Sequence, residues 1–268
     1  MWLIRILSRL ALLYIAAFAI VWFARTWLIY PFSGVYETPA QAGASRLSEY
    51  RLTTQDDNTL IVWAHPAKGR KATIVYFHGN AGNLANRAQR FDRLLDRGYG
   101  VVALAYRGSS GSTGRPSEGV ITKDAILLQG SLTKILGQKP KGKIIYYGES
   151  LGTGVATKLA TTHPPDALIL EAPYTSIVTL AANQMPIFPI RAVLDQRWET
   201  EDYIKRVNIP TLVLHGTEDR VIPYDHGQTI FSLSPANNKV MKTLKGGGHA
   251  AAFSTAGQTA IYRFIAGL

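Results

Sequence analysis

Residues 143–154 read KIIYYGESLGTG, and they say more about the architecture than any other part of the chain. The run at 143–147 is rich in β-branched and aromatic residues and predicts a strand. The next five residues, 148–152, have the Gly-x-Ser-x-Gly spacing of a sharp strand-to-helix turn, where side chains flanking the serine would clash. We therefore predict that Ser150 lies at the end of a strand as a nucleophile. The alternative is an ordinary serine in a glycine-rich turn.

On both sides of this stretch, apolar runs alternate with segments of helical periodicity. The sequence predicts strands at 50–54, 60–65, 72–78, 100–106, 143–147, 167–170, 211–215 and 240–244, and helices at 84–97, 120–136, 151–162, 224–233 and 255–266. The first two strands read as an antiparallel hairpin. The remaining alternation favours an α/β fold with a mostly parallel sheet of about eight strands and helices on both faces. Only 172–208 falls outside this pattern, and we expect a small cap there.

A serine nucleophile needs a base, and the base needs a carboxylate that orients it. In chains with this motif the acid and the histidine follow the serine, each just past a late strand. Asp219 comes directly after the strand at 211–215 and is the predicted acid. The alternatives for the acid are Glu218, Asp225 and the more distant Glu171. His249 follows the last strand in a glycine-rich loop that can carry the imidazole towards Ser150, so it is the predicted base.

A carbonyl oxygen under attack develops negative charge, and two backbone N–H groups are needed to hold it. The N–H of Leu151, at the start of the helix after the serine, is one expected donor. The other is Asn80, in the glycine-rich loop after the third predicted strand. We therefore predict Ser150, Asp219 and His249 as catalytic residues, with Asn80 and Leu151 as the oxyanion hole. For the Asn80 loop, an ordinary strand-to-helix turn is the alternative.

The N-terminal segment 1–32, MWLIRILSRLALLYIAAFAIVWFARTWLIYPF, predicts a membrane anchor. The run 10–24 carries no charge, and the arginines that flank it can extend outward, so a helix over 6–27 could cross the ~30 Å hydrocarbon core. Aromatic residues at its C-terminal end suit a membrane interface. We divide the chain into this anchor and an α/β domain at 33–268 that contains the cap. A cleaved signal peptide and a buried core helix are the alternatives.

Charges on the two flanks of the anchor predict its orientation. The N-terminal flank carries the amine, Arg5 and Arg9, whereas the other flank carries Arg25. The positive-inside rule then gives a single-pass membrane protein with a cytoplasmic N-terminus and an extracytoplasmic main domain. We expect residues 34–268 to fold and act without the anchor.

Composition narrows the class of protein further. The chain has 29 Lys and Arg against 18 Asp and Glu, a net charge of +11 that attracts an anionic membrane surface or nucleic acid. The apolar N-terminus favours the membrane, and we expect no nucleic-acid partner. The absence of cysteine excludes disulfides and a cysteine nucleophile, and no metal or nucleotide motif is present, so we expect no metal and no cofactor. The sequence leaves the oligomeric state open.

One predicted helix carries a row of basic side chains: Arg87, Arg90, Arg93 and Arg97. They are interleaved with acidic residues, so we interpret them as a solvated helix face. Contact with anionic lipid headgroups is the alternative.

Five segments, in chain order, carry a resemblance to a known family. They are HGNAGN (78–83), YRGSSGSTGRPSEG (106–119), GESLGTGVA (148–156), HGTEDRVIP (215–223) and GGGH (246–249). With the N-terminal anchor, they resemble the membrane-anchored Bem46-type branch of the α/β-hydrolase superfamily. The resemblance implies a serine hydrolase with a Ser150–Asp219–His249 triad and no cofactor. Relatives remove acyl chains from S-acylated proteins or act on lysolipids and simple esters.

These observations predict a membrane-anchored serine hydrolase that cleaves carboxylic ester or thioester bonds through an acyl-enzyme. Small molecules, lipids and acylated proteins are the expected substrates, since tethering raises the effective concentration of membrane-borne acyl groups. In the cap, Met185, Ile187, Phe188 and Ile190 form either a rest for an acyl chain or simply the cap core. A serine peptidase of the same fold and a non-catalytic membrane-bound scaffold are the alternatives.

Overall fold

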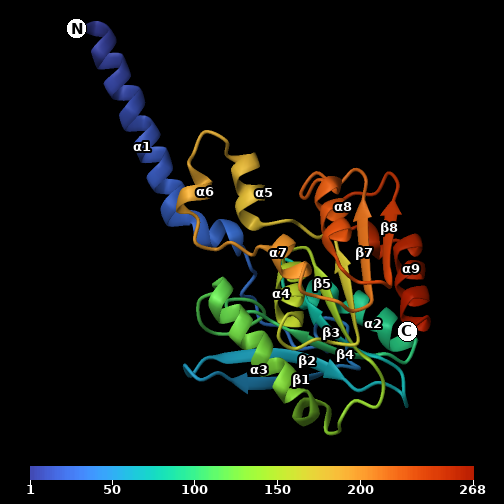
Figure 1. The fold of residues 1–268 in the computed structure, drawn as a ribbon. Coiled ribbons are helices and arrows are strands. Elements are labelled where there is room, and N and C mark those ends of the chain that lie inside the picture. The colour runs from blue at the N-terminus through green and yellow to red at the C-terminus, as the bar shows by residue number, and fades with distance from the viewer.

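Eight strands form one sheet in the computed structural model, which describes all of residues 1–268 (Figure 1). The strands are β1 (Ser48–Thr53), β2 (Thr59–His65), β3 (Thr73–Phe77), β4 (Gly100–Leu104), β5 (Ile144–Glu149), β6 (Ala167–Glu171), β7 (Thr211–Gly216) and β8 (Lys239–Leu244). Their order in the sheet is β1-β2-β4-β3-β5-β6-β7-β8. The β1–β2 and β2–β4 pairs are antiparallel, and all other pairs are parallel. The predicted α/β class, strand number and hairpin are confirmed.

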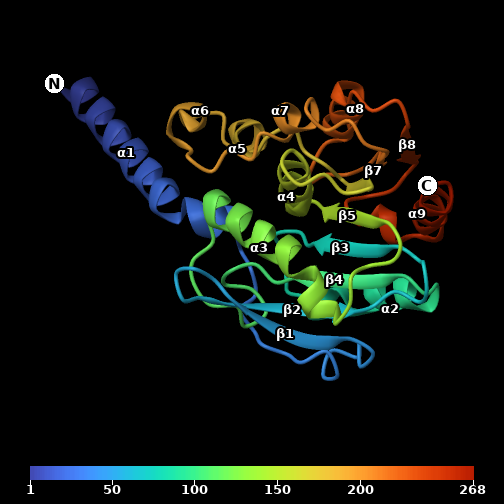
Figure 2. The same ribbon diagram turned by 60° about the horizontal axis from the view of Figure 1, so that its bottom comes forward.

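The chain has nine helices, and several of them cover the two faces of this sheet (Figure 2). They are α1 (Trp2–Ile29), α2 (Ala88–Asp96), α3 (Glu118–Leu136), α4 (Leu151–Ala160), α5 (Ile177–Gln184), α6 (Ile190–Val193), α7 (Thr200–Ile204), α8 (Tyr224–Leu233) and α9 (Thr255–Ala266), with short 3₁₀ turns η1 (Ala85–Arg87) and η2 (Ala251–Phe253). Side chains of α3, α4 and α8 join the core cluster on one face. Those of α2 and α9 join the cluster on the other face. Because both faces are covered, all five residues of β3 are buried.

Local sequence explains where the helices begin and end. The hydroxyl of Ser117 accepts a hydrogen bond from the N–H of Val120 and caps α3, which ends at Gly137 in the left-handed conformation (φ 68°). The helix predicted at 84–97 begins instead as the 3₁₀ turn η1 and continues as α2. The side chain of Asn83 accepts the N–H of Asn86 at that start.

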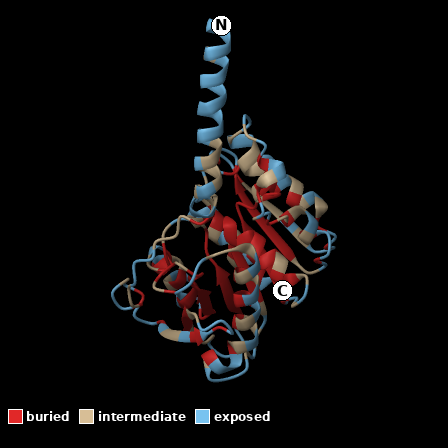
Figure 3. Cartoon of the chain, turned by 90° about the vertical axis from the view of Figure 1, so that its left-hand side faces the viewer, coloured by how far each residue is buried: buried red, intermediate tan, exposed pale blue.

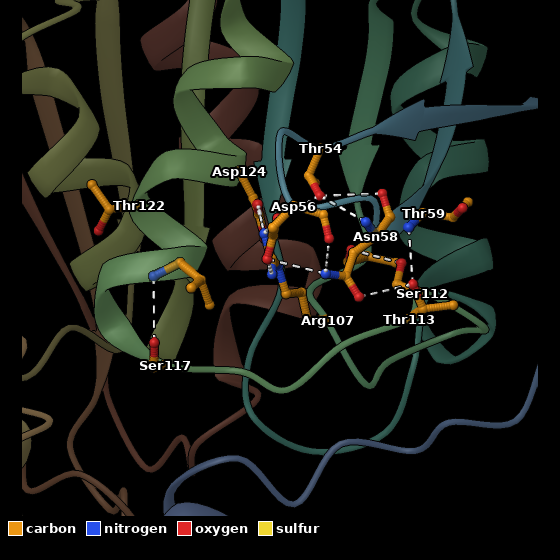
Figure 4. Close-up of polar contacts among 12 residues, drawn as sticks. Thr54, Asp56, Asn58, Thr59, Arg107, Ser112, Thr113, Ser117, Thr122 and Asp124 are labelled. Atoms are coloured by element: carbon orange, nitrogen blue, oxygen red, sulfur yellow. Dashed lines mark hydrogen bonds and ion pairs between the residues drawn. The ribbon is translucent and has the colours of Figure 1, made fainter.

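An ion cluster around the buried Arg107 fixes the loop that follows β4 (Figure 4). Arg107 pairs with Asp124 of α3 at 2.9 Å and with Asp56 of the β1–β2 turn at 2.5 Å, and its side chain is only 5% exposed. In the same loop, the Ser110 hydroxyl accepts a hydrogen bond from the N–H of Leu84 at 2.9 Å. The cluster thereby supports the loop after β3, which carries one of the predicted oxyanion donors.

Helix α1 projects from the domain and has no buried residue (Figure 3). It is long and apolar enough to cross a membrane. Tyr30 and Phe32, which directly follow it, pack into the domain: the indole N–H of Trp198 donates to the Tyr30 hydroxyl at 2.8 Å, and the Phe32 ring lies 5.4 Å from that of Tyr106. Helix α1 is therefore joined to the domain by aromatic contacts of Tyr30 and Phe32, with no free linker between them.

Candidate active site

Ser150 occupies the turn between β5 and α4, as predicted. Its backbone has φ 52° and ψ −117°, a conformation that L-residues rarely adopt. Glycines flank it because the space is closed: a Cβ at Gly148 would meet the backbone of Gly152 and Thr153, and one at Gly152 would meet the carbonyl of Phe77. The strained turn therefore holds the Ser150 side chain at the carboxyl end of the sheet.

His249 and Asp219 converge on this serine from the loops after β8 and β7. Nε2 of His249 lies 3.1 Å from Oγ of Ser150, within hydrogen-bond distance. Nδ1 of His249 lies 2.7 Å from Oδ2 of Asp219. The imidazole is therefore placed to accept the serine proton at one nitrogen while the carboxylate holds the other.

The carboxylate of Asp219 has no exposed side-chain surface. Its other oxygen accepts the backbone N–H groups of Val221 and Ile222, at 2.8 and 2.9 Å. Burial opposes the charged form, but hydrogen bonds from His215, His249 and the Ile222 N–H outweigh it, so the pKa of Asp219 lies well below its usual range. Asp219 is therefore ionised wherever the protein is folded at ordinary pH.

The alternative acids do not reach the imidazole. Both oxygens of Glu171 are held by the guanidinium of Arg90, at 2.6 and 2.9 Å, and the Tyr147 hydroxyl donates to one of them. The Glu171 backbone carbonyl accepts the N–H of Ser150 at 2.9 Å. Glu171 thus supports the turn below the nucleophile. Asp219 is the only carboxylate that forms a hydrogen bond or ion pair with His249, so Glu171, Glu218 and Asp225 do not act as its partner.

The two predicted oxyanion donors lie beside Ser150. Leu151 is the first residue of α4, where backbone N–H groups have no partner within the helix. Asn80 lines the same cavity as Ser150 and Leu151. The loop that carries Asn80 is close to the serine, since a Cβ at Gly79 would lie 3.3 Å from the Ser150 Cβ. A carbonyl oxygen bound at Ser150 can therefore face both segments.

The sequence prediction for the arginine row is wrong for two of its members. Arg87 forms a two-point contact with Glu149, at 2.7 and 3.1 Å, and its side chain is 9% exposed. Arg90 makes the Glu171 pair described above and is 15% exposed. Helix α2 and η1 turn these two side chains inward, because each carboxylate sits at the end of a central strand beside the nucleophile. Arg93 and Arg97 lie over aromatic rings near the surface.

Glu149, the residue before the nucleophile, belongs to this buried network. Burial alone would raise its pKa, but the charge and hydrogen bonds of Arg87, followed by the charge of Arg90, lower the pKa to about 2. The Tyr76 hydroxyl also donates to Glu149 at 2.6 Å. The first variable position of the Gly-x-Ser-x-Gly motif is therefore a charged residue that pairs with Arg87. The spacing of the motif alone did not indicate this ion pair.

A largely apolar cavity of about 260 Å³ opens at Ser150. One wall is the last part of α1, and the other is the cap, with α5 and α6. The lining residues from these segments are Phe18, Val21, Trp22, Arg25, Leu28 and Ile29 of α1, and Ile177, Leu180, Ala181, Gln184, Met185, Ile190, Val193 and Leu194 of the cap. Of the four cap residues singled out in the sequence, Met185 and Ile190 line the cavity, whereas Ile187 and Phe188 lie outside it.

Comparison with known proteins places the chain in a family. Residues 68–200 match the family described as serine aminopeptidase, S33. An uncharacterized protein of Mycobacterium tuberculosis is 32% identical over 250 residues, which cover 91% of this chain and 87% of that protein. Lysophosphatidylserine lipase ABHD12 of Danio rerio is 35% identical over 181 residues, 60% of this chain but only 47% of the relative. The chain is an α/β-hydrolase.

A solved structure agrees with this assignment. Esterase Pf2001 of Pyrococcus furiosus superposes with a TM-score of 0.69 over 88% of this chain and 96% of the esterase, at 17% identity, which shows the shared fold. The predicted resemblance to the Bem46-type branch is confirmed. This α/β-hydrolase is a serine hydrolase.

The contribution of α1 to the cavity was not predicted. The length and hydropathy of the first segment indicate a membrane span but carry no information about what its C-terminal end contacts. The signal that could have suggested it is the aromatic cluster at the end of the segment, of which Trp22 lines the cavity and Tyr30 and Phe32 pack in the domain. Helix α1 therefore supplies part of the cavity wall at Ser150. That residues 34–268 fold and act without it stays a prediction.

Proposed function

We propose that this α/β-hydrolase cleaves carboxylic ester or thioester bonds of lipid-like or acylated substrates, with Ser150 as nucleophile. One observation carries the proposal: Ser150 Oγ, 3.1 Å from His249, opens into an apolar cavity of about 260 Å³. Such a cavity suits the hydrocarbon of an acyl chain whose carbonyl carbon rests at Ser150. The activities of two similar proteins, a lysophosphatidylserine lipase and an esterase, support the same substrate class.

In the first half of the reaction, Ser150 Oγ attacks the acyl carbonyl carbon while His249 Nε2 accepts the hydroxyl proton. Asp219 holds Nδ1–H and stabilises the imidazolium that forms. The carbonyl π electrons move to oxygen, and the N–H groups of Leu151 and Asn80 stabilise this oxyanion. When the carbonyl re-forms, the bond to the leaving oxygen or sulfur breaks and His249 returns the proton to it. The product is an acyl ester on Ser150.

Water completes the second half. It attacks the Ser150 acyl ester and gives a proton to His249, and the tetrahedral intermediate is held by the same two N–H groups. Collapse releases the carboxylic acid and returns the proton to Ser150 Oγ. No group of three or more His, Asp or Glu side chains is placed to hold a metal ion, and every step above uses this chain's own residues and water.

The matching family's description raises aminopeptidase activity as a second candidate. An aminopeptidase must hold a protonated terminal amine, which a carboxylate does well. The cavity has no carboxylate in its lining, and its one charged residue is Arg25, a cation. The apolar, carboxylate-free lining therefore favours an acyl chain over a peptide N-terminus.

We also propose that residues 1–32 anchor the enzyme, that 33–268 form the catalytic domain, and that this domain lies outside the cytoplasm. The support for the orientation is the cationic N-terminal flank, with Arg5 and Arg9. Protease treatment of intact cells or spheroplasts tests it: cleavage of the domain is expected without lysis, and protection until lysis would reverse the orientation.

Hydrolysis of p-nitrophenyl esters from acetate to palmitate, together with labelling by a fluorophosphonate, tests the proposed chemistry. Wild type should label and hydrolyse, with the highest kcat/KM on medium or long chains. Ser150→Ala should lose labelling and about 10⁴-fold or more of the activity. Ser131→Ala on α3 is the control and should behave as wild type. Labelling that persists in Ser150→Ala would remove Ser150 as nucleophile, and absence of Ser150-dependent hydrolysis of any ester would favour the peptidase or the scaffold.

A further inference from the structure

The tip of the cap, residues 185–190, and the helix that leads to it have an unusual composition for a surface segment. Residues 177–190, IVTLAANQMPIFPI, include no charged side chain. Ile187 at the tip is 70% exposed, the most exposed large apolar side chain after residue 29. In Figure 1, α5 and α6 rise from the domain beside α1. Exposed apolar side chains are unfavourable in water, so this loop indicates a site of contact with an apolar environment.

Contacts place this tip against the middle of α1. The Phe188 ring lies 5.5 Å from Tyr14 and 5.8 Å from Phe18. The Tyr14 hydroxyl donates to the backbone carbonyl of Ile187 at 2.9 Å. Tyr14 is fifteen residues before Ile29, about 22 Å along the helix axis. The tip therefore reaches far beyond the point where α1 meets the domain.

The depth of the tip follows from the charge pattern of α1. Any placement of α1 in a bilayer must put its uncharged run, 10–24, in the hydrocarbon core. Tyr14 and Phe18 lie within that run. Whatever touches these two residues must then share their depth, so the cap tip cannot remain in water while α1 spans the membrane.

The backbone of the tip is suited to this position. Residues 186 and 189 are prolines and have no N–H group. The N–H groups of Phe188 and Ile190 are bonded within the tip, at 3.1 and 2.8 Å, and the Ile187 carbonyl is bonded by Tyr14. Few backbone groups are therefore left to be desolvated, which is the main obstacle to placing a loop in hydrocarbon.

We propose that the cap tip, residues 185–190, inserts into the bilayer beside α1, and that the cavity between them takes the acyl chain sideways from the membrane. The cavity is bounded by Phe18 and Val21 on α1 and by Leu180 and Met185 on the cap, and it ends at Ser150. A chain that leaves the hydrocarbon between α1 and the cap meets mostly apolar side chains on its way to the nucleophile. The second clause rests on the proposed ester hydrolysis, whereas insertion of the tip does not.

Insertion can be measured without any activity assay, because the chain has no cysteine and a single introduced one takes a label uniquely. Full-length Ile187→Cys carrying an environment-sensitive NBD fluorophore is reconstituted into phosphatidylcholine vesicles. Lipids brominated on the acyl chain should quench the fluorophore. Ile126→Cys, an exposed apolar position in the middle of α3, is the control and should not be quenched. Equal, weak quenching at both sites would overturn insertion.

Sideways uptake is tested with Ile187→Asp, since Ile187 lies outside the cavity lining and should leave the chemistry intact. Hydrolysis of a long-chain lysophospholipid held in vesicles should fall about tenfold or more, because a charge at this depth opposes insertion. Hydrolysis of soluble p-nitrophenyl acetate should be unchanged, and Ile126→Asp should match wild type on both substrates. Unchanged vesicle activity in Ile187→Asp would overturn sideways uptake. Quenching at Ile187→Cys without any Ser150-dependent hydrolysis would instead refute the proposed function and leave insertion standing.

Discussion

The two sides of the cavity at Ser150 are built in different ways. The catalytic side stands on the carboxyl ends of β5, β7 and β8, above two large core clusters. The wall side is formed by α1 and the cap, and the cap has only a three-residue core of Val178, Ile190 and Leu194. The first side is fixed by the sheet, whereas the second depends on contact with a helix suited to a membrane. Changes on the catalytic side should therefore remove chemistry or stability, and changes on the wall side should alter which substrate is used.

The largest effect is expected from His249→Ala. Without the imidazole, no group near Ser150 can accept its proton, so kcat should fall by about 10⁴- to 10⁶-fold. The residue lies on a loop and is 30% exposed, so the melting temperature should hardly change. His163→Ala, in the loop between α4 and β6, provides the control. Turnover of p-nitrophenyl esters and thermal melting measure both quantities, and near-normal turnover in His249→Ala would remove it from the mechanism.

Asp219→Asn should follow, with a fall in kcat of about 10³- to 10⁴-fold, because the amide holds the imidazole in the wrong tautomer. This change also has a predictable pH signature. The pKa of Asp219 is lower in the folded protein than in the unfolded chain, so its charge stabilises the fold above the unfolded value of about 4. That contribution is lost as pH falls towards the folded value.

Urea unfolding at several pH values measures this signature. The difference in unfolding free energy between wild type and Asp219→Asn should be complete at neutral pH and should shrink below about pH 4. A difference that grows on acidification would contradict the assigned hydrogen bonds. Kinetics at neutral pH report the catalytic role separately.

Glu149→Gln tests the support beneath the nucleophile. It leaves the guanidinium of Arg87 without its charge partner in a largely buried site, which should lower the unfolding free energy by about 3 kcal/mol. Because the pKa of Glu149 is lowered to about 2 from 4.5, the loss should be complete above pH 4.5 and should fade as pH falls towards 2.

The control for Glu149→Gln is Asp202→Asn, which breaks the exposed pair with Lys205 and should cost less than about 1 kcal/mol. Equal losses in the two variants would show that the Arg87 pair contributes no more than a surface contact. Turnover should fall less than in His249→Ala, since Glu149 touches neither the base nor the expected position of substrate.

The catalytic side was predictable because its signals are local or follow chain order. A tight turn needs glycines at 148 and 152, and the loops after the last two strands had to supply the base and its carboxylate. The partners of Arg87 and Arg90 were not predictable, because an arginine on an amphipathic helix reads as solvated until the strand ends that face it are known. Which carboxylate an arginine pairs with is decided by tertiary contacts, and these contacts leave no periodic pattern in the sequence.

The two segments of the wall side could each be predicted, but the contact between them could not. Hydropathy identified α1, and interrupted alternation identified the cap at 172–208, but nothing in either segment states that they face each other. Their contact is made by a few aromatic side chains, such as Tyr14 and Phe188, separated by more than half of the chain. The sequence does not show which cap side chains face α1. For the same reason it could not predict that Met185 and Ile190 line the cavity while Ile187 and Phe188 do not.

The smallest effect, and the one that best separates the two sides, is expected from Ala181→Trp. Ala181 lies on α5 in the cavity lining, so an indole there occupies space that the distal part of a long acyl chain would use. We expect kcat/KM to fall about tenfold for the palmitate ester, a loss of about 1.4 kcal/mol in transition-state binding, and much less for acetate. The peak of the chain-length profile should move to shorter chains.

Ala182→Trp is the matched control for this variant, because the neighbouring residue on the same helix is outside the cavity lining. It should keep the wild-type chain-length profile. If both variants lower all chain lengths equally, the cap acts on the chemistry as a whole, and the division between a catalytic side and a wall side fails. If only Ala181→Trp shifts the profile, the cap sets acyl-chain length while the sheet-borne residues carry out bond cleavage. Chain-length selectivity would then change with the cap and α1 while the catalytic residues stay the same.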